Sequence, residues 1–156
     1  LDVDYHHGNG TQDIFYARGD LLFVSIHADP RMDYPYYWGH ADETGEGAGE
    51  GTTLNIPLSE GTSGREHHQA FMDALEAIQG RFPPDLVIVS AGFDSRRGDP
   101  LGGLLLEDSD FYEMTRQVMG LAERHGSGRV VSVLEGGYNL DTLGETVRTH
   151  LAALAS

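Results

Sequence analysis

The sequence contains no cysteine, which excludes disulfide bonds, thiol nucleophiles and every cysteine-based zinc motif. Any metal site would therefore be built from histidines and carboxylates. Basic residues are scarce, because 10 Lys and Arg stand against 25 Asp and Glu, for a formal net charge of −15. This balance argues against a nucleic-acid partner and favours a cationic substrate. No apolar run approaches the roughly 20 residues of a membrane span and no signal peptide opens the chain, so we expect no membrane partner and a cytoplasmic location.

Short apolar runs alternate with amphipathic segments along the chain. The strongest runs are continuous and rich in β-branched residues, as buried parallel strands tend to be. Alternating strands and helices predict an α/β fold, with a parallel sheet and helices on both faces. The expected strands are Leu1–Asp4, Leu21–Ile26, Thr53–Ile56, Leu86–Ser90 and Val130–Leu134, and the expected helices cover about Gly64–Gly80, about Asp108–His125 and Leu140 to the end. Leu1–Asp4 reads as the tail of a strand already in progress, so we expect that an N-terminal portion is missing.

The stretch Asp29–Thr52 has neither a helical nor a strand period. A loop of this length is uncommon unless it builds a site. Its acidic glycine run, Gly45–Gly51, lacks the lysine of a phosphate-binding loop and carries two carboxylates, so we interpret it as a flexible turn.

Polar side chains follow several of the expected strands. Asp4 and His6 come after the first run, His27 after the second, Asp94 after the fourth and Tyr138 after the fifth. The carboxyl ends of parallel strands share one edge of a sheet, and ligands of open α/β sheets bind there. These side chains are therefore expected to converge.

Asp2, Asp4 and His6 are spaced so that all three share a face of an extended segment. Asp4 and His6 could hold one cation, and Asp94 would complete a three-ligand set with an open position, as in catalytic zinc sites. Such ligands also suit Fe²⁺, Co²⁺ or Mn²⁺. The alternative is a hydrogen-bonded strand end without metal. Tyr138 would donate to a developing oxyanion, or would be a packed tyrosine in a turn.

For the remaining histidines we predict structural or surface positions without a catalytic role. His67 and His68 are expected to be structural or superficial. His7 would point away from His6 in an extended segment. Solvated positions are predicted for His40, His125 and His150.

Three blocks resemble the histone deacetylase and acetylpolyamine amidohydrolase superfamily. Asp2–Gln12 (DVDYHHGNGTQ) resembles its first metal-binding segment. Ser90–Asp94 (SAGFD), followed by Gly98–Gly103 (GDPLGG), resembles the second metal-binding segment of class II-like members. Leu134–Asn139 (LEGGYN) resembles the segment with the catalytic tyrosine. The blocks occur in the family's order and cover nearly the whole chain.

The resemblance implies an arginase/deacetylase-like fold and zinc-dependent hydrolysis of N-acetyl amides, either acetyl-lysine in proteins or acetylated polyamines. It implies Asp4, His6 and Asp94 as zinc ligands and Tyr138 as the transition-state donor. Several further residues are implied by position. They are Asp2 and Ser25, with main-chain oxygens of Asp4, His6 and Ile26, for a structural potassium ion, and Tyr37, Gly136 and Gly137 for the substrate tunnel.

One part of the family pattern lies outside the chain. The family's tandem histidines, its general base and acid, precede the first metal segment. Residues 1–156 are therefore expected to form the C-terminal part of a single deacetylase catalytic domain, weakly active or inactive alone and with an exposed sheet edge. Two alternatives stay open, an arginase-like Mn²⁺ hydrolase and a non-catalytic remnant that binds metal or acyl ligands. Substrate choice and homo-oligomer formation also stay open.

Overall fold

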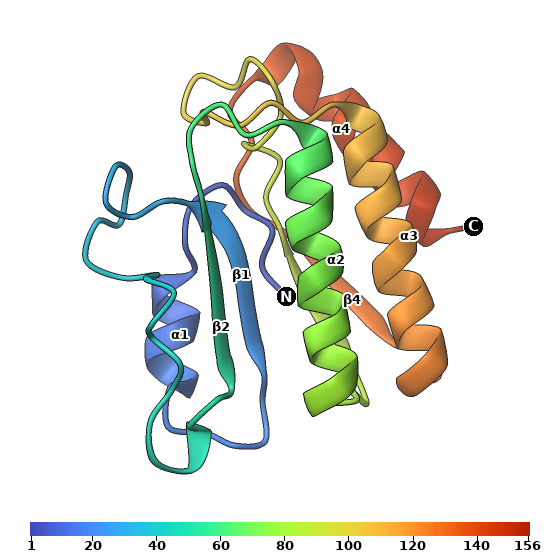
Figure 1. The fold of residues 1–156 in the computed structure, drawn as a ribbon. Helices are drawn as coiled ribbons and strands as arrows, with labels where there is room; N and C mark the ends of the chain where they lie inside the picture. Colours follow the sequence, from blue (N-terminus) through green and yellow to red (C-terminus); the bar gives the residue numbers. More distant parts are fainter.

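The computed structural model describes all of residues 1–156, which form an α/β fold with four strands and four α-helices (Figure 1). A single 3₁₀ turn, η1 (Gly47–Gly49), interrupts the long loop between the first two strands. No helix is long and apolar enough to cross a membrane. In chain order the elements are α1 (Asn9–Phe15), β1 (Phe23–Ala28), β2 (Thr53–Leu58), α2 (Gly64–Arg81), β3 (Val87–Ala91), α3 (Asp108–His125), β4 (Val130–Leu134) and α4 (Leu140–Leu154).

The strands form two parallel pairs, β1 with β2 and β3 with β4. The segment Leu1–Asp4 lies between the pairs, because Asp2 bridges in parallel to Ser25 of β1 and to Ser90 of β3. The amide of Asp2 donates to the carbonyl of Val24 at 2.7 Å, and that of Val3 donates to Ser90 at 3.1 Å. All strands therefore run in one direction, and their carboxyl ends meet at one edge.

Helices cover the two faces of the sheet unequally. The helices α2, α3 and α4 pack on one face, where a core of 20 buried residues includes Val24, Ile26, Val89, Phe71 and Phe111. The short α1 covers only β1 and β2 on the opposite face (Figure 1). On that face Ile88, at 51% exposure, and Val131, at 49%, face solvent as paired neighbours of β3 and β4.

His150 is buried at 7% exposure, so the prediction that it is solvated was wrong. Its Nδ1 lies 2.7 Å from Thr115 Oγ1 on α3, and its Nε2 lies 2.8 Å from Ser132 Oγ on β4. Thr115 donates its own hydrogen to the carbonyl of Phe111, so Nδ1 carries the imidazole proton and Nε2 accepts from Ser132. The ring thereby joins α4 to its two neighbours.

The glycine-rich run is more ordered than the expected flexible turn. The amide of Glu46 donates to the carbonyl of Tyr16 at 3.0 Å, and η1 packs against the chain that leaves α1. A Cβ on Gly49 would lie 2.4 Å from the same carbonyl oxygen, so only glycine fits this contact.

Candidate metal site

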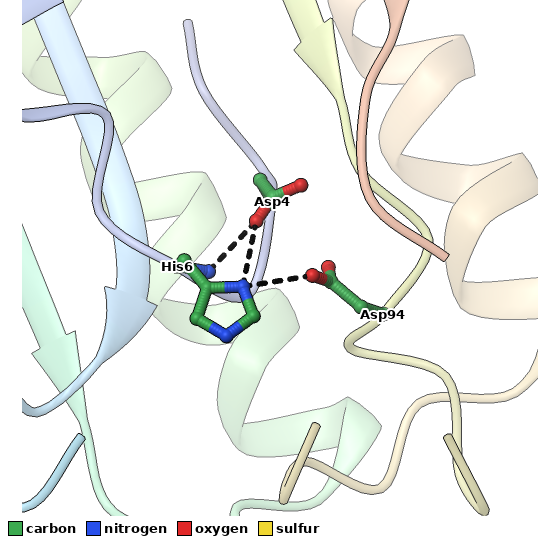
Figure 2. Close-up of side chains that lie close together, drawn as sticks. All are labelled: Asp4, His6 and Asp94. Carbon is green, nitrogen blue, oxygen red and sulfur yellow. Dashed lines mark hydrogen bonds and ion pairs between the residues drawn. The ribbon is translucent and has the colours of Figure 1, made fainter. Parts of the chain in front are cut away.

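Asp4, His6 and Asp94 converge at the carboxyl edge of the sheet (Figure 2). The Nδ1 of His6 lies 3.0 Å from Asp94 Oδ2 and 3.3 Å from Asp4 Oδ1. One ligand atom from each residue lies within 4.8 Å of the other two. The sequence therefore predicted correctly that these three residues, called the triad below, lie together. Their role as metal ligands stays a prediction.

The triad fits a small divalent ion. Ligands at about 2.0 Å from a tetrahedral zinc lie about 3.3 Å apart, close to the two distances above. The three donors are one imidazole and two carboxylates, which zinc and other borderline ions accept. A fourth protein ligand is missing from the cluster, which leaves a coordination position open for substrate or water.

The electrostatics of the triad also favour a cation. Hydrogen bonds that His6 donates to the carboxylates of Asp4 and Asp94 raise the pKa of His6 to about 10. Burial raises the pKa of Asp94, which is fully enclosed. Burial acts in the same direction on Asp4, but hydrogen bonds from His6 and Gly136 outweigh it and lower the pKa of this carboxyl. In the absence of metal, a proton on His6 neutralises part of this buried negative charge.

Main-chain groups hold the two carboxylates in place. The amide of Gly136 donates to Asp4 Oδ2 at 2.9 Å, and that of Tyr5 donates to Asp94 Oδ1 at 2.8 Å. A Cβ on Gly136 would lie 2.4 Å from Asp94 Oδ2 and 2.6 Å from Asp4 Oδ2. The glycine that follows β4 is therefore dictated by close packing against the triad.

Tyr138 follows on the same segment and is 46% exposed. Burial of the phenol raises its pKa, and the negative charges of Asp94, Asp4 and Asp99 act in the same direction. The hydroxyl forms no hydrogen bond within the protein, although the backbone amide of Tyr138 donates to Asp99 Oδ2 at 2.7 Å. The residue is thus fixed through its main chain.

The residues of the implied potassium site lie together beneath the triad. Asp2 is buried, and burial raises its pKa to about 8. Its Oδ1 accepts from the amide of Asp4 at 3.0 Å, and its backbone carbonyl accepts from Ile26. Ser25 is fully buried, with its Oγ 2.9 Å from Nδ1 of His27. The ion itself stays a prediction.

Two aromatic rings lie against His6, that of Tyr5, at a centroid distance of 5.0 Å, and that of Tyr34, for which no role was predicted. The centroid of the Tyr34 ring is 6.1 Å from that of His6. Tyr37, the predicted tunnel wall, is 83% exposed, and its role stays a prediction. The loop that follows β1 is joined to the segment of Asp4 and His6 by Tyr5, whose hydroxyl donates to Asp33 Oδ2 at 2.6 Å.

The other histidines lie apart from the triad. His7 is buried on the α1 side, where its Nε2 lies 2.9 Å from Gln12 Oε1. His27 is fully buried beside it, with ring centroids 4.6 Å apart. His67 is a buried residue of α2 whose Nε2 has no partner, in agreement with the structural role predicted for it.

Asp99 is the polar residue at this edge that sequence reasoning missed. Its Oδ2 accepts from the amides of Tyr138 and Asn139, and its Oδ1 from that of Leu101. From the sequence, Asp99 was noted only as part of the Gly98–Gly103 block, and no role was predicted for it. The 39-residue gap to Tyr138 hid the longer contact.

Comparison with known proteins agrees with this geometry. The model of the histone deacetylase domain matches residues 1–154. Acetylpolyamine amidohydrolase 1 of Pseudomonas aeruginosa is 45% identical over 92% of this chain and 40% of its own length. Acetylpolyamine amidohydrolase of Mycoplana ramosa is 42% identical over 99% of the chain and 44% of its own length. The chain therefore spans less than half the length of these relatives.

Solved structures give the same result for the fold. The crystal structure of an acetylpolyamine aminohydrolase from Burkholderia pseudomallei superposes with a TM-score of 0.92 at 38% identity, over 100% of this chain and 44% of that one. A histone deacetylase homologue from Aquifex aeolicus gives 0.92 at 29% identity, over 99% and 40%. The domain match and these relatives together show that the chain belongs to the histone deacetylase family.

Proposed function

We propose that the chain carries the metal-binding and oxyanion-stabilising part of an enzyme that hydrolyses N-acetyl amides. The substrate would be acetyl-lysine in proteins or an acetylated polyamine. The observation that carries the proposal is the convergence of Asp4, His6 and Asp94 at the strand edge next to Tyr138. The chain spans about 40–44% of the length of its relatives. We therefore propose the hydrolytic activity for a whole protein of which these residues form one part.

Asp4, His6 and Asp94 would hold one Zn²⁺, with Fe²⁺ or Co²⁺ as alternatives. When bound, such an ion acts as a Lewis acid that polarises a carbonyl and makes water a better nucleophile at neutral pH. Tyr138 would donate its phenolic hydrogen to the carbonyl oxygen as negative charge develops there. Oxyanion donors of this kind are worth about 3–4 kcal/mol.

The substrate would enter past the loop that follows β1. Tyr37, with the backbone of Gly136 and Gly137, would line the tunnel for an aliphatic stem. Tyr34 supports this placement, because its ring lies against His6. The excess of carboxylates would attract the cationic remainder of a polyamine or basic peptide. A structural K⁺ is proposed for Asp2 and Ser25, with carbonyl oxygens of Asp4, His6 and Ile26.

A second candidate function is binding of metal and acyl ligands without efficient turnover. His6 is the one histidine whose side chain forms hydrogen bonds with Asp4 and Asp94, so none of the other seven histidines is placed to move protons there. Without an imidazole to move protons, the rate of these 156 residues alone would be lower by about 10²–10⁴-fold.

Acetate release from zinc-loaded protein tests the proposal, with an acetyl-lysine peptide and N-acetylputrescine as the two substrates. We expect one zinc ion per chain, slow zinc-dependent release, and loss of that release in Tyr138→Phe with zinc content unchanged. Tight binding of benzohydroxamate without acetate release would favour the binding function. Two divalent metal ions per chain, or activity with Mn²⁺ alone, would contradict the single-zinc proposal.

A further inference from the structure

The segment that carries Tyr138 is held at two points by carboxylates. At its start, the amide of Gly136 donates to Asp4 of the triad. Two residues later, the amides of Tyr138 and Asn139 both donate to Asp99 Oδ2, at 2.7 and 3.1 Å. Between these points Gly137 has a φ of +135°, a conformation that side chains rarely adopt.

Asp99 is itself held in place by hydrogen bonds within its own loop. It is 8% exposed, its Oδ1 accepts from the amide of Leu101 at 2.9 Å, and its own amide donates to the carbonyl of Arg96. The Nδ2 of Asn139 donates back to the carbonyl of Gly98 at 2.9 Å. Hydrogen bonds to the side chain of Asp99 and to the backbone of Gly98 therefore join the segment that carries Tyr138 to the turn at Gly98–Leu101.

From this geometry we propose that Asp99 is the positioning residue of Tyr138. It fixes the backbone from which the phenol projects and leaves the hydroxyl without an internal partner. The inference rests on the proposed function, since it assigns to Asp99 the placement of the group that would stabilise the oxyanion. Charged acceptors of two amides bind more strongly than neutral ones, which explains a carboxylate at this position.

The first test is amide hydrogen exchange by NMR on the metal-free chain, which requires no catalysis. In Asp99→Asn we expect the amides of Tyr138 and Asn139 to exchange at least about 10-fold faster, since a hydrogen bond to a charged acceptor is stronger than one to a neutral acceptor. The matched control is Asp141→Asn, which removes a charge next to the same segment but accepts no hydrogen bond. Unchanged exchange in Asp99→Asn would overturn the proposal.

The second test is a double-mutant cycle on the zinc-loaded chain, read by benzohydroxamate affinity and by acetate release. A displaced phenol would lower the rate by about 10- to 100-fold in Asp99→Asn. If Asp99 acts through Tyr138, Asp99→Asn should cause no further loss in the Tyr138→Phe background. Equal losses in both backgrounds would mean that Asp99 acts elsewhere, and the proposal would fail.

The two tests separate the positioning role from the proposed function. A zinc-loaded wild type that neither binds hydroxamate nor releases acetate would refute the deacetylase function, while the exchange result would still decide whether Asp99 holds the segment. If Asp99→Asn does not fold, Asp99→Glu replaces it. That variant keeps the charge but moves the carboxylate by one methylene, and the same faster exchange is expected.

Discussion

At the scale of single residues, Gly136 shows how tightly the triad is enclosed. Its missing side chain leaves the space in which two carboxylates approach the backbone. We expect Gly136→Ala to displace Asp4 and Asp94, to lower zinc affinity, and to destabilise the fold by about 1–3 kcal/mol through overpacking. Calorimetric zinc titration and urea unfolding measure the two effects.

Gly144→Ala is the matched control for this substitution. A Cβ there meets nothing within 4 Å, and the residue lies inside α4. Alanine should stabilise the helix by about 0.5–1 kcal/mol and leave zinc affinity unchanged. Wild-type zinc affinity in Gly136→Ala would show that the carboxylates do not need this close approach.

His67 gives the clearest pH dependence away from the triad. Burial lowers its pKa from 6.5 to about 4, with a smaller contribution from His68. In the unfolded chain His67 therefore binds a proton below about pH 6.5, whereas in the folded chain it stays neutral until the pH falls to about 4. Stability should fall over that window, by about 3 kcal/mol in total from this one group.

His67→Leu should remove that part of the acid loss, because the unpartnered Nε2 is replaced by apolar atoms. Urea midpoints at pH 7 and pH 4.5 measure the difference between the two proteins. Exposed His125→Gln serves as the control and should keep the wild-type pH slope. An identical slope in His67→Leu would mean that another group controls the acid limb.

At the scale of elements, the strong periodic signals predicted most of the fold. The strands at Leu86–Ser90 and Val130–Leu134 and the helix at Asp108–His125 lie where their patterns placed them, within one residue. The first long strand is Phe23–Ala28 instead of Leu21–Ile26, because pairing with β2 begins at Phe23 and continues through the polar His27. Propensity alone does not register such pairing.

The structure also contains an element that the pattern did not predict. The helix α1 has seven residues, and its one buried side chain is the polar Gln12. It therefore lacks the apolar face by which a helix is recognised in sequence. The triad was predictable because its members end neighbouring strands, whereas Asp99 and Tyr34 reach the site from loops whose paths depend on tertiary contacts.

The first part of the loop that follows β1 is anchored by the hydroxyl of Tyr5, which donates to Asp33, whereas later parts are held at Gly39 by His27 and at Glu43 by Gln12. Tyr5→Phe should therefore loosen the loop around Asp33 and the residues next to it while leaving the core intact. Trp38, the only tryptophan, lies in the loop and reports on it. We expect lower fluorescence anisotropy and stronger acrylamide quenching in Tyr5→Phe than in the control Tyr112→Phe on α3. Equal anisotropy in both variants would mean that the hydroxyl does not restrain the loop.

At the scale of the whole molecule, the sheet is covered on one face and half open on the other. Leu86, Ile88, Val131 and Val133 are each 47–51% exposed on the open face. A groove of about 640 Å³ continues from Leu86 and Ile88 toward α1. Contiguous apolar surface of this kind promotes association.

The chain should therefore self-associate in a concentration-dependent manner through this open face. Val131→Lys should lower the mass measured by light scattering toward the monomer, because it places a charge in the centre of that face. Ala152→Lys adds the same charge on the exposed side of α4 and should change nothing. Monomeric wild type at high concentration would contradict the prediction.

The triad also joins distant parts of the chain, since His6 and Asp94 are 88 positions apart, with His6 after the central segment Leu1–Asp4 and Asp94 after β3. An ion held between them would act as a cross-link that the unfolded chain lacks, so folding and metal uptake become one linked equilibrium. At a free zinc concentration 1,000 times the Kd, the added stability is about 4 kcal/mol. The melting temperature should rise with zinc and fall with a chelator, and Asp94→Asn should abolish both responses.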